Sequence, residues 1–427
     1  MAAQLYETTS GRLFHAGAVA VITVGLPARG KTHASRSLCR YMRWLGVSTK
    51  VFSVGNYRRE RLGSLSEEWF DPRKLLEATE TRLQVADECL GDLIDWLQTG
   101  GGQVAIFDGN NVTEARRKQI HDKLLDNDIH PLFLEFICNK PDIILANIRS
   151  VKISSPDYVG WDPEEAVKDY KRRIKQHEDN YETITDTTLP FVKNMNAGEQ
   201  FIVNNVIGYL QSRIVYYLMN LHIQRRTIYF ARSGPSLNDN SYKADANLSV
   251  EGEKYAEKLT EFMLAYHDQK NAFRTADEER PLTVWTSTQK KSLETAIPFI
   301  NAGIPVRQQS VLNQLNPGES DGLSPAEVKE KFPEEIAKVK ENPYRHRYPR
   351  AESYHDLAVR LESVIMELER EKNDVLIIAH ETVLRCLYAY LFDRPASEIP
   401  TISIPRSCLI EITPSAYGCK ESRMEIL

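Results

Sequence analysis

The sequence predicts a protein of two α/β domains, in which short apolar strands alternate with longer amphipathic helices. From Ala18 onward, runs of small and β-branched residues alternate with stretches at helical spacing, and the same pattern starts again at Arg226. The chain has 427 residues, which suits two or three domains, each with a core of its own. Several of the apolar runs end in polar residues, at the position where α/β sheets bind ligands. We therefore expect two α/β domains that divide near residue 224.

The first half has the pattern of a parallel sheet wrapped by helices. The expected strands are 19–24, 49–54, 104–108, 131–137 and 201–203, and the expected helices are 34–45, 77–97, 113–125 and a long one that ends near 219. In the second half we expect strands at 226–230, 282–287 and 375–380. The charged stretch 268–281 is expected to be a surface insertion because it is poor in apolar residues.

Composition excludes several classes of function. The net charge of −5 argues against a general nucleic-acid-binding surface, and no apolar run approaches the ~18 residues needed to span a membrane. The six cysteines form no C-x-x-C pair, which favours reduced thiols. Residues 1–15 lack the apolar core of a secretory signal, so we expect a cytoplasmic protein.

The most specific motif is GLPARGKT, which fits G-x-x-x-x-G-K-[ST] between a predicted strand and a predicted helix. Its backbone N–H groups would surround a phosphate, Lys31 would reach the β- and γ-phosphates, and the Thr32 hydroxyl would hold Mg²⁺. The predicted nucleotide-phosphate site is Gly25, Leu26, Pro27, Ala28, Arg29, Gly30, Lys31 and Thr32.

Asp108 ends a predicted strand, where such proteins place a second carboxylate that holds Mg²⁺. The alternative is a turn or helix-capping aspartate. A phosphoryl acceptor that is itself anionic would need further cations. The candidates are Arg58, Arg82, Arg116, Lys152 and Arg173. The stretch 151–158 is polar and turn-rich, which favours a functional role over packing.

The segments GLPARGKT, VGNYRRE, FDGNN, NIRSVKISSPDY and QSRIVYYLMNLH together resemble the 6-phosphofructo-2-kinase/fructose-2,6-bisphosphatase family from about residue 17 onward. The resemblance implies a P-loop NTPase-like kinase domain at 17–223 after an extension at 1–16. A bisphosphatase-like domain would follow at 224–427, with the histidine-phosphatase fold of phosphoglycerate mutase. It also implies transfer of the γ-phosphoryl group of ATP to the 2-hydroxyl of fructose 6-phosphate, and a homodimer through the kinase halves.

Carried over by position, the resemblance implies roles for single residues. Lys31, Asp108, Cys138 and Lys152 would be catalytic, and Asn147 to Lys152 would form a second ATP-binding segment. For Cys138 the alternative is an ordinary buried thiol. Fructose 6-phosphate would be bound by Arg58, Arg82, Asn110, Arg116, Lys152, Arg173 and His177. Asn110 and His177 depart from the family's Thr and Tyr, and because both can still hydrogen-bond we expect altered affinity rather than lost activity.

The second domain departs further from the family pattern. Ser233 stands where the family has its nucleophilic His, and Gln314 where it has the Glu that protonates the leaving group. Lys291 replaces an Arg that holds phosphate in a bidentate fork. Substrate-binding Tyr, Arg and Lys are replaced by Pro325, Val339 and Pro343, whereas Arg232, Tyr354, His380 and Arg385 match the family.

These features predict an ATP- and Mg²⁺-dependent 6-phosphofructo-2-kinase with an inactive phosphatase-like domain. One alternative keeps weak residual hydrolysis at Ser233 or through a water molecule. Another is a non-catalytic sugar-phosphate sensor, in which Arg232, His380 and Arg385 still bind an anion. A P-loop kinase acting on polynucleotide ends is disfavoured by the acidic charge balance.

Overall fold

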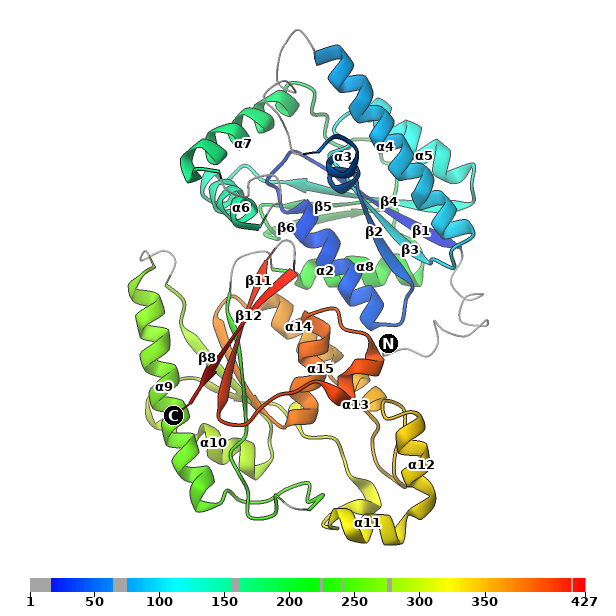
Figure 1. Cartoon of the computed structure of the whole chain (residues 1–427). Helices are drawn as coiled ribbons and strands as arrows, with labels where there is room; N and C mark the ends of the chain where they lie inside the picture. The colour runs from blue at the N-terminus through cyan, green and yellow to red at the C-terminus, as the bar shows by residue number, and fades with distance from the viewer. Residues whose placement is uncertain are drawn as a thin grey trace. The chain divides into compact units, whose positions relative to one another are not determined.

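The computed structural model describes residues 17–63, 75–154, 161–222, 226–239, 241–274, 279–415 and 418–426. Side chains are described at most of these positions. The chain forms two compact units that divide between Ile223 and Gln224, and each unit is a sheet covered by helices (Figure 1). The predicted fold class, two successive α/β domains, is confirmed.

The first unit is built on a six-stranded sheet in the order β2-β3-β1-β4-β5-β6. Its first five strands run parallel, and β6 is antiparallel to β5. The strands are β1 (Ala18–Val24), β2 (Thr49–Ser53), β3 (Val104–Asp108), β4 (Ile129–Ile137), β5 (Phe191–Met195) and β6 (Gln200–Asn204). All residues of β3 are buried, as expected for a strand covered by helices on both faces.

Most helices of this unit lie between successive strands, and the last one follows β6. They are α2 (Lys31–Trp44), α3 (Val54–Leu62), α4 (Leu75–Gln98), α5 (Glu114–Leu125), α6 (Pro141–Ser154), α7 (Pro163–Glu178) and α8 (Tyr209–Asn220). The core between α4, α5 and the sheet contains Ile22, Phe107 and Phe133, which are fully buried. This packing holds β1 and β3 side by side, with Ile22 opposite Phe107, so the loops that follow them lie together.

The second unit has a six-stranded sheet in the order β12-β11-β7-β10-β8-β9. Strands β7, β10, β8 and β9 are parallel, and β11 is antiparallel to β7. The strands are β7 (Ile228–Arg232), β8 (Leu282–Thr286), β9 (Val306–Gln308), β10 (Asp374–Ala379), β11 (Cys408–Ser415) and β12 (Gly418–Glu425). Ala379 at the end of β10 pairs with Arg232 at the end of β7, so the residues that follow these two strands are neighbours.

Helices again cover the sheet of the second unit. They are α9 (Val250–Ala272), α10 (Lys290–Asn301), α11 (Pro325–Lys331), α12 (Pro333–Glu341), α13 (Tyr354–Arg360), α14 (Glu362–Arg370) and α15 (Glu381–Leu391), with short 3₁₀ turns η6 (Ser310–Leu312), η7 (Gly318–Ser320) and η8 (Ala396–Thr401).

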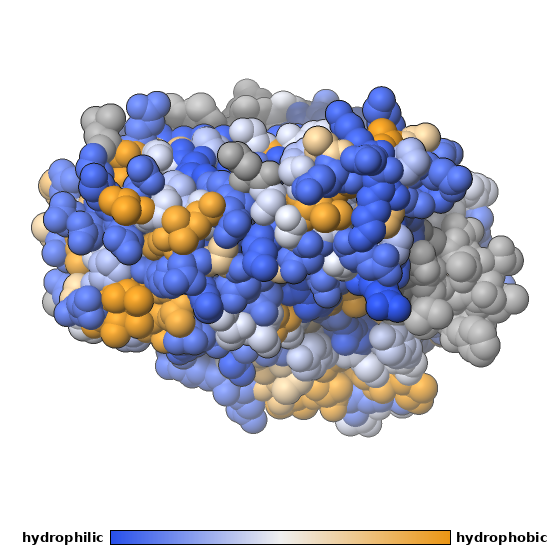
Figure 2. Space-filling view, turned by 90° about the horizontal axis from the view of Figure 1, so that it is seen from below, coloured by the Kyte–Doolittle hydropathy of each residue, from blue (hydrophilic) through white to orange (hydrophobic). Residues whose placement is uncertain are grey.

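One face of the molecule is mostly hydrophilic, with apolar side chains gathered in separate patches (Figure 2). Within the described residues, no helix combines the length and apolar character that crossing a bilayer requires.

Two expectations need correction. The stretch 268–281 is not wholly an insertion, because its first residues, as far as Ala272, belong to α9. The polar stretch that starts at 151 does not begin as a turn, because α6 extends through Ser154. Residues 155–160 lie outside the described part of the chain.

Candidate active sites

The first site is built on the loop between β1 and α2. Gly25, Ala28 and Gly30 have φ values of 132°, 61° and 91°, all in the left-handed region. A Cβ atom on Gly25 would lie 2.6 Å from the carbonyl oxygen of Phe136, which is why glycine is needed there. Left-handed backbone of this kind allows successive N–H groups of a loop to turn toward a bound phosphate.

Lys31 lies at the start of α2 and is buried, with 7% of its surface exposed. Its Nζ donates hydrogen bonds to the carbonyl oxygens of Gly25 at 2.9 Å and Leu26 at 2.6 Å. Burial lowers the pKa of Lys31 to about 7, and Asp108 opposes that shift. The amine is therefore held inside the loop in which a phosphate group would be placed.

Thr32, near the start of α2, meets Asp108, at the end of β3. The Thr32 hydroxyl donates to Oδ2 of Asp108 at 3.0 Å. Burial raises the pKa of Asp108, whereas Lys31 and the Thr32 hydroxyl lower it. A hydroxyl beside a buried carboxylate is an oxygen donor set that fits Mg²⁺, which keeps part of its water shell.

The loop that follows Asp108 is fixed to β1 by several hydrogen bonds. The Thr23 hydroxyl donates to the carbonyl oxygen of Gly109 at 2.7 Å and accepts from its N–H at 3.0 Å. The Gly25 N–H donates to the carbonyl oxygen of Asn110, and Asn111 Nδ2 donates to the carbonyl oxygen of Thr23, both at 2.9 Å. These contacts hold the two loops in one arrangement. Sequence reasoning missed Thr23 and Asn111.

Asn110 and His177 contact each other, although they lie 67 residues apart in the chain. Asn110 Nδ2 is 3.4 Å from His177 Nε2. Burial, followed by the charges of Lys31 and Arg82, lowers the pKa of His177 to about 4. A neutral imidazole on α7 therefore faces the loop after β3, close to two cations.

The structure places the remaining predicted residues of the first site as follows. Asn147 Nδ2 on α6 donates to the carbonyl oxygen of Ala28 at 3.0 Å, which joins the second ATP segment to the phosphate loop. Cys138 is buried at 4% exposure just beyond β4. Arg58, Arg82 and Arg116 are half-buried, and Arg116 pairs with Asp87 at 2.6 Å. The side chains of Lys152 and Arg173 lie outside the described part of the structure.

The second site lies where β7 and β10 end. The Ser233 N–H donates to the carbonyl oxygen of Ala379 at 3.1 Å, and Ser233 is 4% exposed. His380 caps the N-terminus of α15, because its Nδ1 accepts from the Thr382 N–H at 3.3 Å. Burial, reinforced by nearby cations, lowers the pKa of His380 well below its usual value. His380 is therefore a neutral imidazole with a capping role.

Lys291 and Gln314 are joined directly. Lys291 Nζ donates to Oε1 of Gln314 at 2.6 Å, and Gln314 Nε2 donates to the carbonyl oxygen of Lys243 at 3.2 Å. Burial lowers the pKa of Lys291 to about 8. Both ends of the Gln314 amide are thus bonded to protein groups.

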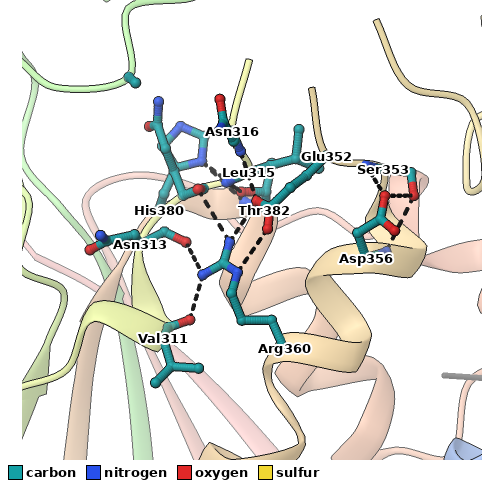
Figure 3. A network of polar contacts seen from close by, with 12 residues as sticks. Val311, Asn313, Leu315, Asn316, Glu352, Ser353, Asp356, Arg360, His380 and Thr382 are labelled. Atoms are coloured by element: carbon teal, nitrogen blue, oxygen red, sulfur yellow. Dashed lines mark hydrogen bonds and ion pairs between the residues drawn. The ribbon is translucent and has the colours of Figure 1, made fainter. Parts of the chain in front are cut away.

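Arg360 on α13 supports the segment that carries Gln314, as Figure 3 shows. Its guanidinium donates to the carbonyl oxygens of Val311 at 2.6 Å and Asn313 at 3.0 Å, and it pairs with Glu352 at 2.8 Å. The Leu315 N–H donates to the Thr382 hydroxyl at 3.4 Å, which links the same segment to the residues around His380. Nothing in the local sequence around Arg360 indicates this role, because the carbonyl groups of Val311 and Asn313 lie 49 and 47 residues away in the chain.

Arg232 and Arg385 share one carboxylate. Glu381 pairs with Arg232 at 3.1 Å and with Arg385 at 2.6 Å. Arg385 also donates to the Tyr354 hydroxyl at 2.9 Å. Sequence reasoning missed Glu381, whose position directly after His380 was the available signal.

Comparisons with known proteins match both halves of the chain. Residues 6–225 match the family model described as 6-phosphofructo-2-kinase, and residues 228–426 match the histidine phosphatase superfamily, branch 1. A 6-phosphofructo-2-kinase/fructose-2,6-bisphosphatase of Gallus gallus is 42% identical over 405 residues, covering 94% of this chain and 83% of the relative. The human protein numbered 1 is also 42% identical with the same coverage, and the Rattus norvegicus protein numbered 3 is 41% identical over 410 residues, covering 94% of this chain and 70% of that one.

Proposed function

Because the chain belongs to the 6-phosphofructo-2-kinase/fructose-2,6-bisphosphatase family, we propose that it makes fructose 2,6-bisphosphate and does not hydrolyse it. The family membership gives a 6-phosphofructo-2-kinase domain that uses ATP. The proposed loss of hydrolysis is inferred from this chain's own residues.

The observation that carries the kinase assignment is the convergence of Lys31, Thr32 and Asp108. Lys31 and Thr32 begin α2 and Asp108 ends β3, and the contact between Thr32 and Asp108 supports a role of these residues in phosphoryl transfer. A Mg²⁺ ion, when bound by Thr32 and Asp108, would neutralise charge on the phosphates. Lys31 would stabilise the charge of the transferred group, and the surrounding loops would hold the reactants in line.

We assign the acceptor sugar to the region around Asn110 and His177. Both side chains are neutral hydrogen-bonding groups, and the cations Arg58, Arg82 and Arg116 come from α3, α4 and α5. Lys152 and Arg173 complete the proposed set by resemblance, and Cys138 and Asn147 are assigned to the ATP side. Because Asn110 and His177 contact each other, we expect fructose 6-phosphate affinity to depend on them jointly.

The second domain lacks the groups that hydrolysis through a phosphohistidine requires. Ser233 has no basic nitrogen and no hydrogen-bonded general base in the described structure. Gln314 cannot donate a proton to a leaving group, and both ends of its amide are already bonded. His380, the remaining histidine of the site, accepts from the backbone of α15.

The test is to incubate the full chain with Mg²⁺-ATP and fructose 6-phosphate and to follow the acid-labile bisphosphate with time. We expect product to accumulate and to persist after ATP is removed with hexokinase and glucose. Lys31→Met is the control for a product made by the first site. Product that decays would show that the second domain hydrolyses, and the absence of product would favour a non-catalytic sugar-phosphate sensor.

A further inference from the structure

Glu381 occupies an unusual position at the second site. It is the first residue of α15, an eleven-residue helix, and its two carboxylate oxygens contact arginines from different elements. Oε2 lies 3.1 Å from Nη1 of Arg232, at the end of β7, and Oε1 lies 2.6 Å from Nη2 of Arg385, one turn further along α15. One side chain therefore bridges the two arginines.

The same arrangement would suit a phosphate group. Two guanidinium groups and the N-terminus of a helix are the features with which proteins bind phosphate, because together they provide positive charge and N–H donors. Here a carboxylate of the chain itself takes that place. The side chains of Arg232, Arg385 and Glu381 are 17%, 22% and 22% exposed, so the bridge is partly shielded from water.

Both arginines also donate to backbone carbonyl oxygens of the domain. Arg385 Nε donates to the carbonyl oxygen of Ile402 at 2.7 Å, and Arg232 Nη1 donates to that of Ile404 at 3.2 Å. The nearby cations are paired too, since Lys291 donates to Gln314 and Arg406 pairs with Asp239. Each of these four described cations thus has at least one partner within the domain.

We propose that Glu381 is a built-in anionic ligand of Arg232 and Arg385, and that it keeps phosphate groups out of the second site. A phosphate that entered would have to share both arginines with a carboxylate, and two anions so close repel each other strongly in a shielded site. This goes beyond lost hydrolysis, because Ser233 and Gln314 would remove catalysis while leaving binding possible. It also predicts the opposite of an anion sensor built on Arg232, His380 and Arg385.

The test measures binding of ³²P-labelled inorganic phosphate to the full chain by equilibrium dialysis. Glu381→Gln keeps the shape of the side chain and removes its charge. We expect this variant to bind one more phosphate per chain than the natural sequence. The dissociation constant of the added phosphate should be at least about tenfold lower than that of any phosphate that binds at this site in the natural sequence. Phosphate bound in the kinase domain is common to both proteins and cancels in the comparison.

Two further variants define the site. Glu398→Gln removes a charge from η8, where Glu398 lies 3.8 Å from Arg394, and is expected to bind phosphate as the natural sequence does. Adding Arg385→Gln to Glu381→Gln should abolish the extra phosphate, because one of the two arginines is lost. Far-UV circular dichroism and the melting temperature check that each variant is folded. If Glu381→Gln does not fold, Glu381→Ala is used in its place.

Two results would overturn the proposal. One is tight phosphate binding at this site in the natural sequence, matching that of Glu381→Gln. The other is a folded Glu381→Gln or Glu381→Ala variant that gains no phosphate. Neither result depends on turnover, so failure here is distinguishable from failure of the proposed kinase or of the proposed loss of hydrolysis.

Discussion

At the scale of single residues, the two sites differ in what their sequence motifs could predict. The motif GLPARGKT predicts both which residues form the phosphate loop and their backbone geometry, because the loop needs left-handed backbone at Gly25 and Gly30. The contacts that align this loop with its neighbour run from Thr23 to Gly109 and Asn111, 86 and 88 residues away. Such pairings come from the tertiary fold, so no local pattern could predict them.

Lys31 gives a prediction for the pH dependence of ATP binding. Its pKa is lowered to about 7 in the free protein, and anionic phosphates beside it would raise that pKa again. Between the free and bound pKa values, binding of ATP therefore takes up a proton, and the contribution of Lys31 to affinity is full below pH 7 and weakens as pH rises. Titration calorimetry of ATP binding at pH 8, in two buffers of different ionisation enthalpy, measures this proton uptake.

Lys31→Met is the matched control, because methionine keeps the chain length and cannot titrate. The variant should lose this proton uptake and lower kcat about 100-fold or more, because a donor to the transferred group is gone. An equal proton uptake in both proteins would show that another group titrates.

At the scale of elements, continuous apolar runs identified strands such as β1, β3 and β10 well. Helix α9 shows why a boundary was missed. Its buried positions Tyr255, Leu259, Met263 and His267 repeat every four residues, and the last of them is polar. His267 Nε2 lies 3.4 Å from Oδ2 of the buried Asp374, so a tertiary contact with this carboxyl group extends the buried face of the helix beyond the apolar pattern. Strands β6 and β12 carry weaker apolar patterns because their residues are exposed or half-buried.

The contact between α9 and the loop after β7 gives a prediction of stability. A Cβ atom on Gly252 would lie 2.2 Å from the carbonyl oxygen of Pro235, a backbone atom that cannot move independently. We expect Gly252→Ala to lower the free energy of unfolding of the second domain by about 1–3 kcal/mol, because the segment that carries Ser233 must shift. Urea denaturation followed by circular dichroism measures the change.

Gly91→Ala is the control for this substitution. Gly91 lies in α4 with nothing within 4 Å of an added Cβ, so alanine should stabilise that helix by up to about 1 kcal/mol. If Gly252→Ala were equally harmless, the close packing of α9 against the loop would not constrain the site.

At the scale of the whole molecule, assembly is the property that single residues reveal least. Strand β6 lies at one edge of the sheet of the first unit, and among the described strands it pairs only with β5. Its Ile202 and Val203 are 40% and 46% exposed. Exposed apolar residues on an unpaired edge favour pairing with another chain, and the family resemblance implies a homodimer through the kinase halves.

We therefore propose that two copies of the chain associate through their β6 edges. Ile202→Lys should weaken the dimer at least about 100-fold, because a charge would be buried at the strand pairing, and lysine is a residue with which proteins protect sheet edges. Sedimentation velocity over a range of protein concentrations measures this. Leu125→Lys is matched, since Leu125 is 48% exposed at the end of α5 in the same unit and should leave the dimer intact. If the dimer persists with Ile202→Lys and dissociates with Leu125→Lys, the interface lies on the α5 face instead. If the natural chain sediments as a monomer at all concentrations, β6 is not an assembly surface.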